Sequence, residues 1–229
     1  MRPHQILDCV VTGDGRELVL SRRGDVFHIH IDRYELMASR AHGSEEELAR
    51  LALSALGPRA ASTAAPRVLI GGLGMGFTLR AALDALGDQP GAVVDIAEVF
   101  PAVVVWNRGP LAPLARHPLA DPRVNVMEAD VADVVAAAAG RYDAVLLDVD
   151  NGPEALTLES NHRLYAPAGL RRLLAALAPG GVLAVWSTDD DPRFAHRLRE
   201  TGFTVTTRHV RARAGRGERH VVFVAQRPP

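Results

Sequence analysis

Hydrophobic and polar residues alternate over residues 5–36, with interruptions at 13–15 and 23–25 that contain glycine and aspartate. Alternation with a period of two is typical of strands with one buried face, and short turns of this composition join antiparallel strands. The beginning of the chain therefore predicts a small antiparallel β unit.

A helical pattern follows the β unit. Leu48, Leu51 and Leu56 recur at helical spacing, and the Gly-Pro pair at 57–58 ends the pattern. Ser44 and Glu47 have the spacing of a capping box, which predicts that the helix begins next to Ser44. We interpret residues 1–58 as an N-terminal unit, and residues 59–229 as a Rossmann-like domain that opens with an Ala- and Ser-rich linker.

Strand and helix patterns alternate in the second unit, which is typical of a parallel sheet with helices on both faces. The last two strand patterns have only a loop between them and should pair antiparallel. We therefore predict an α/β fold with a doubly wound, mostly parallel seven-stranded sheet, like that of class I methyltransferases. The predicted strands lie near 67–71, 92–98, 123–128, 142–148, 181–187, 203–210 and 220–225.

Glycines gather where the first strand of this series ends. Gly71, Gly72, Gly74 and Gly76 precede a predicted helix near 77–86. Glycine permits positive φ angles and close backbone approach, and the first N–H groups of a helix point towards whatever lies at the turn. The pattern indicates a nucleotide-type ligand, with a plain structural turn as the alternative.

Acidic residues end the strands that follow. Glu98 comes about 20 residues after Gly76, where an acid can accept hydrogen bonds from both hydroxyls of a ribose. Asp130 and Asp148 end two later strand patterns, and ligands of open parallel sheets lie beyond such carboxyl ends. A carboxylate at position 148 is suited to take up the proton of a nucleophile that attacks an activated carbon.

Composition excludes some classes of partner. A net charge of −1 argues against a nucleic acid held by bulk electrostatics, and the single cysteine cannot form an internal disulfide. We find no membrane-spanning apolar run and no export signal, and we expect a cytoplasmic protein without a membrane partner. His28 and His30 alternate on one strand without a third ligand at matching spacing, so no metal is expected.

Taken together, these motifs resemble the spermidine synthase family of polyamine aminopropyltransferases, in the class I S-adenosylmethionine-dependent methyltransferase superfamily. The segments that carry the resemblance are 71–76, 98–103, Asp130 and 142–153. The resemblance implies that the glycine turn holds the sulfonium side of S-adenosylmethionine or its decarboxylated form. It also implies that Glu98 binds the ribose, that Asp130 binds the adenine amino group, and that Asp148 helps to deprotonate an amine. A homodimer is implied as well.

Departures from the family pattern concern both ligands. The family has an aspartate in the glycine turn where this chain has Gly74, so the anionic partner of a decarboxylated donor is missing. Ordinary S-adenosylmethionine is therefore also admissible. The family's tyrosine and glutamine residues near the first helix are replaced by the segment 37–45, and the loop 148–153 is one residue shorter. The acceptor pocket is therefore rebuilt, and putrescine cannot be assumed.

Three functions stay open: transfer of an aminopropyl or related alkyl group to an amine, methyl transfer to a small molecule, and non-catalytic nucleoside binding or dimerisation. Asp150 and Asn151 would orient the acceptor or simply form a turn, and His42 would reach the pocket mouth. The segment 148–151 also resembles the Asp-x-Asp loop of metal-dependent O-methyltransferases, but a further Asp-Asn pair is lacking.

Two polar segments receive structural interpretations. On the helix after Glu98, Trp106 is expected in the core and Asn107 on the surface. The acidic run 189–191 precedes Pro192, so we expect it to cap a helix, with binding of a distal ammonium group as the alternative.

Overall fold

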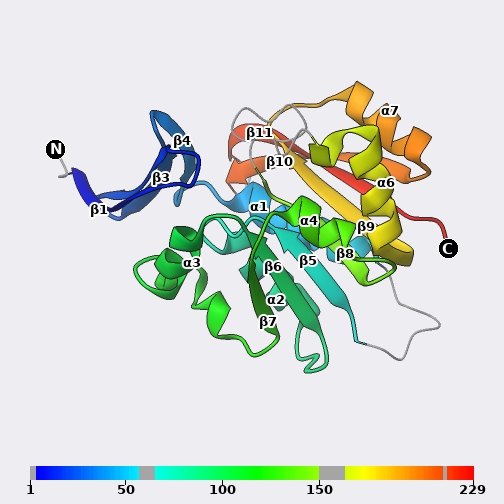
Figure 1. Cartoon of the computed structure of the whole chain (residues 1–229), viewed down its shortest axis with the longest axis horizontal. Helices are drawn as coiled ribbons and strands as arrows, with labels where there is room; N and C mark the ends of the chain where they lie inside the picture. The colour runs from blue at the N-terminus through cyan, green and yellow to red at the C-terminus, as the bar shows by residue number, and fades with distance from the viewer. Residues whose placement is uncertain (1–3, 57–64, 150–162, 214–215) are drawn as a thin grey trace.

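Two β-sheets and the helices around them make up the protein (Figure 1). The computed structural model describes residues 4–56, 65–149, 163–213 and 216–229. The smaller sheet lies at one end of the molecule, and helix α1 (Gly43–Ala55) follows it into the body. None of the helices in these ranges is both long and apolar enough to cross a membrane.

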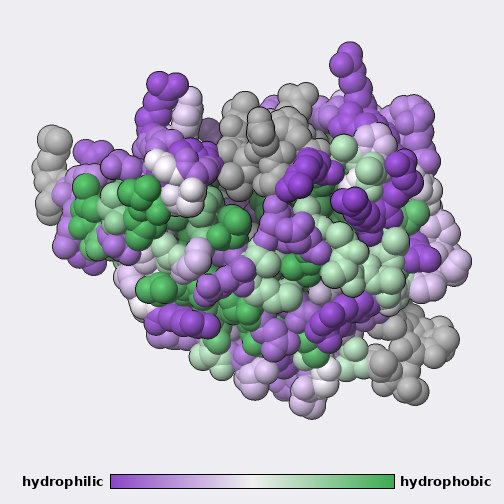
Figure 2. All heavy atoms as spheres, in the orientation of Figure 1, coloured by the Kyte–Doolittle hydropathy of each residue, from purple (hydrophilic) through white to green (hydrophobic). Residues whose placement is uncertain are grey.

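The small sheet is antiparallel, as the alternating pattern predicts. Leu18, Leu20 and Ile29 are buried in the same hydrophobic cluster as residues of the large sheet. The outer strand exposes Ile6 and Val11, and Figure 2 shows apolar side chains on the surface at this end of the molecule. In chain order, its strands are β1 (His4–Val11), β2 (Glu17–Arg23), β3 (Val26–Ile31) and β4 (Tyr34–Ala38).

The large sheet has seven strands in the order β10-β11-β9-β8-β5-β6-β7. Strands β5 to β9 pair in parallel, whereas β11 pairs antiparallel with both β9 and β10. The predicted fold class is confirmed, including the C-terminal hairpin. The strands are β5 (Arg67–Gly71), β6 (Val93–Glu98), β7 (Val124–Glu128), β8 (Tyr142–Leu147), β9 (Leu177–Ser187), β10 (Thr204–Arg213) and β11 (Arg216–Gln226).

Helices cover both faces of the large sheet. Val68 and Ile70 of β5 belong to one hydrophobic cluster, and Leu69 between them belongs to a second. The first cluster contains buried residues of α1, α2 and α3, and the second contains those of α4, α6 and α7. The sheet is therefore doubly wound. The further helices are α2 (Phe77–Leu86), α3 (Pro101–Arg108), α4 (Val131–Ala136), α6 (Pro167–Ala176) and α7 (Pro192–Thr201), with 3-10 turns at Ala112–Ala115 and Pro118–Ala120.

The capping box predicted for the first helix is wrong. Helix α1 begins at Gly43 with His42 at the N-cap position, so Ser44 already lies in its first turn. The Ser44 hydroxyl instead donates a hydrogen bond to the carboxylate of Glu45, at 2.6 Å. Most of the predicted linker lies outside the described residues, and the division at residue 58 stays a prediction.

A buried carboxylate ties the central strands together near their amino ends. Asp95 of β6 is 2% exposed, and its Oδ2 accepts hydrogen bonds from the Arg67 guanidinium at 2.7 and 2.9 Å. Asn125 of β7 donates to Oδ1 at 3.1 Å, and the Tyr142 hydroxyl of β8 lies 3.2 Å from Oδ2. This network fixes four neighbouring strands at the edge remote from the glycine turn.

We expect Asp95→Ala to lower the free energy of unfolding by about 3 kcal/mol, because removing one partner leaves the remaining polar groups without compensation. Urea denaturation measures this loss. The matched control is Asp84→Ala, since Asp84 is half exposed and pairs with Arg80 and Arg116 at the surface. Asp84→Ala should lower the free energy of unfolding by less than about 1 kcal/mol. Equal losses in the two variants would contradict a structural role for the network.

Candidate active site

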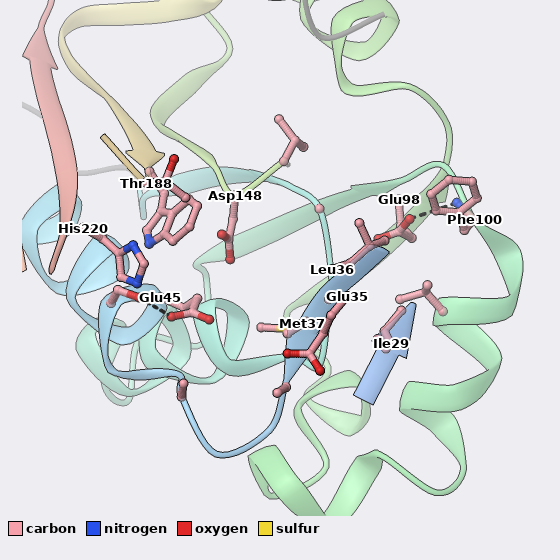
Figure 3. Close-up of a pocket in the computed structure, with 18 of the residues that line it drawn as sticks. Ile29, Glu35, Leu36, Met37, Glu45, Glu98, Phe100, Asp148, Thr188 and His220 are labelled. Carbon is pink, nitrogen blue, oxygen red and sulfur yellow. Dashed lines mark hydrogen bonds between the residues drawn. The ribbon is translucent and has the colours of Figure 1, made fainter. Parts of the chain in front are cut away.

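A cavity of about 570 Å³ lies at the carboxyl ends of β5, β6 and β8, where the sequence predicts a ligand. Gly72, Gly74, Glu98, Asp130 and Asp148 all line it. Strand β4 of the small sheet forms another wall, and the ends of β9 and β11 complete the lining (Figure 3). The cavity therefore lies between the two sheets, and both contribute side chains.

The glycine turn makes close backbone contact with both neighbouring strands. The N–H of Gly72 donates to the carbonyl of Ala97 at 2.9 Å, and the N–H of Asp148 donates to the carbonyl of Gly71 at 3.0 Å. Gly72 has a φ of +86°, and a Cβ there would lie 2.4 Å from the Asp148 carbonyl oxygen. Only glycine meets both conditions. The turn thus fixes Asp148 at the cavity wall.

Glu98 is buried beneath the turn and holds it in place. One carboxylate oxygen accepts the N–H of Leu73 and the other accepts the N–H of Phe100, each at 2.9 Å. Burial raises the pKa of Glu98, and the hydrogen bonds from backbone N–H groups act in the opposite direction. Each carboxylate oxygen can accept a further hydrogen bond, which the hydroxyls of a ligand in the cavity can supply.

Asn107 supports the same turn and was missed by sequence reasoning. The prediction that it lies on the surface is wrong, because it is 1% exposed. Its amide group donates to the carbonyl of Gly74 at 2.8 Å and to that of Val103 at 2.9 Å. An asparagine side chain inside a helix can compete for the backbone hydrogen bonds of that helix. Its occurrence within α3 was therefore the one sequence feature that could have indicated a structural role for Asn107. The neighbouring Trp106 is buried as predicted.

Asp148 and Glu45 form an interacting acidic pair at the cavity. The Thr78 hydroxyl donates to Oδ2 of Asp148 at 2.5 Å, and Glu45, 7% exposed, lies on the first turn of α1. Burial raises the pKa of Glu45 to about 7, and repulsion from Asp148 adds to this shift. Burial also raises the pKa of Asp148 to about 6, against the effect of Thr78. Near neutral pH, the pair therefore changes its protonation.

The sequence places Glu45 in the segment 37–45 of the rebuilt acceptor pocket but does not single it out as a site residue. Acidic residues are common in the first turn of a helix because they complement its dipole, so Glu45 and Glu46 look equivalent in the sequence. The structure separates them, since Glu45 lines the cavity whereas Glu46 pairs with His42. Only the packing of α1 against the sheet makes this distinction.

Asp130 lines the cavity at the start of α4. Its Oδ1 accepts the N–H of Ala132 at 2.8 Å and so caps the helix, while its Oδ2 lies 3.8 Å from the Arg163 guanidinium. The cap holds the side chain in one orientation. The predicted role of Asp130 in binding an adenine amino group stays a prediction.

Residues at the ends of β4, β9 and β11 form the remaining walls. The sulfur of Met37 would lie 3.0 Å from a Cβ on Gly74, so Met37 covers the glycine turn from the small sheet. The rings of Trp186 and His220 contact each other with centroids 4.8 Å apart and planes tilted by 37°, and burial lowers the pKa of His220. Thr188 follows β9 on the same wall. Trp186, Thr188 and His220 were not predicted as site residues, and Met37 was included only as part of the segment 37–45.

The sequence of the chain gives no match to a known family. No protein-family model matches it. A search of curated proteins likewise finds no match.

Solved structures of spermidine synthases match the fold of this chain. The chain superimposes on spermidine synthase from Thermotoga maritima with a TM-score of 0.73 at 18% identity, covering 96% of this chain and 72% of that one. The fold is that of the spermidine synthases. A probable spermidine synthase from Corynebacterium glutamicum gives a TM-score of 0.63 at 15% identity, covering 99% and 81% of the two chains.

Structures of methyltransferases also match the chain. The 1,6-didemethyltoxoflavin-N1-methyltransferase of Burkholderia thailandensis matches with a TM-score of 0.55 at 20% identity, covering 81% of this chain and 79% of that one. The predicted resemblance to spermidine synthases within the class I methyltransferase superfamily is therefore confirmed at the level of fold.

Several predicted site residues lie away from the cavity or outside the described ranges. The His42 ring stacks on Phe77 with centroids 4.1 Å apart and does not line the cavity, although Arg40 does. Asp150 and Asn151 lie outside the described residues. Their predicted roles in acceptor binding stay predictions.

Gly71 and Gly76 shape the turn from behind the cavity wall. A Cβ on Gly71 would lie 2.8 Å from the side chain of Val131, and Gly76 occupies the N-cap of α2 with a φ of +82°. Neither residue lines the cavity itself. Gly71 and Gly76 would therefore affect a bound cofactor only through the shape of the turn. The predicted role of the whole glycine turn in cofactor binding stays a prediction.

Within the described ranges, no group of three or more His, Cys, Asp or Glu side chains is arranged to hold a metal ion. His28 instead pairs with Glu35 at 2.7 Å on the small sheet, and His30 lies 3.8 Å from the same carboxylate.

We expect Glu45→Gln to stabilise the protein at pH 8. A raised pKa means that the folded state holds its proton while the unfolded chain has lost it, so ionisation destabilises the fold as pH rises from about 4.5 to 7. The gain should be about 2 kcal/mol at pH 8 and below about 1 kcal/mol at pH 5. Urea denaturation at both pH values measures it. A gain independent of pH would contradict the burial of an ionisable Glu45.

Proposed function

We propose that this protein is a transferase that binds S-adenosylmethionine or its decarboxylated form and transfers an aminopropyl or related alkyl group to a small amine. The observation that carries the proposal is that Glu98, the glycine turn and Asp148 meet at one cavity. The fold supports it, because structural neighbours bind related ligands: a spermidine synthase holds the transition-state analogue AdoDATO, and the toxoflavin methyltransferase holds S-adenosylhomocysteine.

The residues present fit an adenosyl donor. The Glu98 carboxylate lines the cavity, where ribose hydroxyls can donate to it, and Gly72 and Gly74 leave open the space that side chains would fill. Asp130 lies on the same rim, where it can accept a hydrogen bond from an adenine amino group. Bound there, the donor supplies a sulfonium, whose adjacent carbon is already activated for attack.

Asp148 is placed to prepare the nucleophile. An amine enters as an ammonium ion, and the Asp148 carboxylate accepts one of its protons. The amine nitrogen then forms a C–N bond while the C–S bond breaks and its electron pair stays on sulfur. Thr78 holds Oδ2 of Asp148 by a 2.5 Å hydrogen bond, which fixes the base for this transfer.

A second candidate function is methyl transfer to a small molecule on the same scaffold. The observation in its favour is position 74 of the turn, where this chain has glycine in place of the acid that would meet the cationic tail of a decarboxylated donor, and where Met37 covers the turn. The nucleoside product separates the two functions. Aminopropyl transfer leaves methylthioadenosine, whereas methyl transfer leaves S-adenosylhomocysteine.

The partners that we propose are a small amine acceptor and a second copy of the chain in a homodimer, as the resemblance to spermidine synthases implies. A cytoplasmic location belongs to the same proposal. The exposed Ile6 and Val11 on the outer strand of the small sheet suit a contact between subunits.

We expect micromolar binding of S-adenosylmethionine, its decarboxylated form or methylthioadenosine, with Glu98→Ala reducing affinity beyond detection. The loss is expected because the variant removes both carboxylate oxygens that would accept hydrogen bonds from the ribose. It also removes the hydrogen bonds by which Glu98 holds the turn in place. Isothermal titration calorimetry measures the affinity, and Glu128→Ala at the exposed end of the neighbouring strand β7 serves as control. A wild-type protein that binds none of the three nucleosides would overturn the proposal.

Asp148→Asn should keep nucleoside affinity within about threefold and lower the rate of transfer by about 100-fold or more, the scale expected for loss of a general base. Single-turnover assays with the bound donor and an amine acceptor measure the rate. Unchanged transfer in this variant would assign the proton acceptor to another group.

A further inference from the structure

Glu45 and Asp148 each receive one hydrogen bond from a side chain of the described residues. Ser44 donates to Oε2 of Glu45, and Thr78 donates to Oδ2 of Asp148. The backbone N–H of Glu45 also acts on its own carboxylate. Each carboxylate can therefore accept further hydrogen bonds from a ligand in the cavity. Figure 3 shows both carboxyl groups directed into the same cavity.

The described residues supply no counter-ion to the pair. Among the described residues, no arginine forms an ion pair with Glu45 or Asp148, although Arg40 and Arg213 line the same cavity. Partly buried carboxylates are ordinarily paired with a cation or a metal. The other charged residues lining the cavity are Glu35, Glu98, Asp130 and Glu218, all acidic.

His220 supplies an independent indication of a ligand. Its side chain is about nine-tenths buried and lines the same cavity as Glu45 (Figure 3). Its Nδ1 has no hydrogen-bond partner among the described residues. A buried polar nitrogen without a partner is costly, so a small rotation of the ring towards a bound donor would be favourable. The imidazole is neutral near pH 7 and can accept such a bond.

We propose that Glu45, Asp148 and His220 form a subsite for one primary ammonium group, in which Glu45 is a specificity-determining residue of the acceptor site. The inference rests on the proposed function and specifies its acceptor. A primary ammonium has three N–H donors and one positive charge, which match three acceptor groups around a cationic position. A hydroxyl or thiol acceptor has one donor and no charge, and it would leave two of the three groups unsatisfied.

Binding of the ammonium changes the protonation of the pair. Without a cation, repulsion and burial keep a proton on one of the two carboxyls over part of the range between pH 6 and 7. A cation between them favours ionisation of both, so the proton leaves to solvent. The charged groups that act on Glu45 are Asp148, which follows β8, and Glu46 on its own helix, and Glu46 contributes only a weak repulsion. His220 from β11 lines the same cavity.

The test uses n-butylamine as the probe, with the full chain saturated by methylthioadenosine. Calorimetry at pH 6.5 in two buffers of different ionisation enthalpy gives both the affinity and the number of protons released. We expect butylammonium to bind with release of about half a proton or more, and n-butanol to bind at least about tenfold more weakly. Butyltrimethylammonium, which has the charge without N–H donors, should bind about tenfold more weakly than butylammonium.

Glu45→Gln should weaken butylammonium binding by about tenfold and reduce proton release to less than half of the wild-type value. His220→Phe, which keeps an aromatic ring against Trp186, should weaken binding by about threefold or more. The matched control is Glu46→Gln, because Glu46 pairs with His42 away from the cavity. It should leave affinity and proton release unchanged.

Equal affinity for butylammonium in wild type and Glu45→Gln would overturn the subsite, and so would a preference of the wild type for n-butanol. Wild-type protein that binds methylthioadenosine but not butylammonium would overturn it as well while leaving the nucleoside site intact. Failure to bind methylthioadenosine would instead count against the proposed function itself. The Glu45→Gln variant is expected to fold, because a glutamine oxygen can still accept the Ser44 hydroxyl.

Discussion

The contact between the glycine turn and the end of β8 determines the geometry of the whole site. The backbone of Gly72 lies so close to the Asp148 carbonyl that a side chain at position 72 would collide with it. This contact sets the position of the proposed base relative to the turn. Glu98 and Asn107 hold the turn from below through hydrogen bonds to its backbone. The site is therefore rigid where donor and acceptor would meet, which favours a fixed attack geometry.

The acidic groups of the cavity lower the stability of the fold when they ionise, and they supply the carboxylates that the proposed reaction needs. Burial raises the pKa values of Glu45, Glu98 and Asp148, which means that each ionised carboxylate destabilises the empty site. Asp95 shows the contrast, since it is equally buried but is neutralised by Arg67. Groups that lack such compensation are typical of sites where a ligand supplies it. The uncompensated acids lie at the cavity and the compensated one lies at the opposite edge.

Much of the fold was predictable because it follows from local patterns. Alternation over 5–36 predicted the small sheet, and the strand–helix repeat with its final hairpin predicted the large one. Asp191 caps α7 through a hydrogen bond to the N–H of Arg193 at 2.8 Å, as the acidic run before Pro192 indicated. These features depend on residues that are close in sequence. The start of α1 was misplaced because Ser44 has the capping spacing but bonds to Glu45.

The walls of the site were harder to predict because they come from packing between distant segments. Met37 meets Gly74 only because the small sheet folds over the turn, and His220 reaches the cavity from the last strand of the sheet. Glu45 and Glu46 differ only in the direction in which α1 presents them. Strand-end acids and glycines, in contrast, are placed by sheet topology alone, which explains why Glu98 and Asp148 were found from sequence.

The decisive measurement is a crystal structure of the protein with methylthioadenosine bound. Both ribose hydroxyls should lie within about 2.6–3.2 Å of the Glu98 carboxylate oxygens, with the thioether sulfur next to the glycine turn and facing Asp148. A nucleoside bound away from this rim, or with its ribose remote from Glu98, would contradict the proposed nucleoside site.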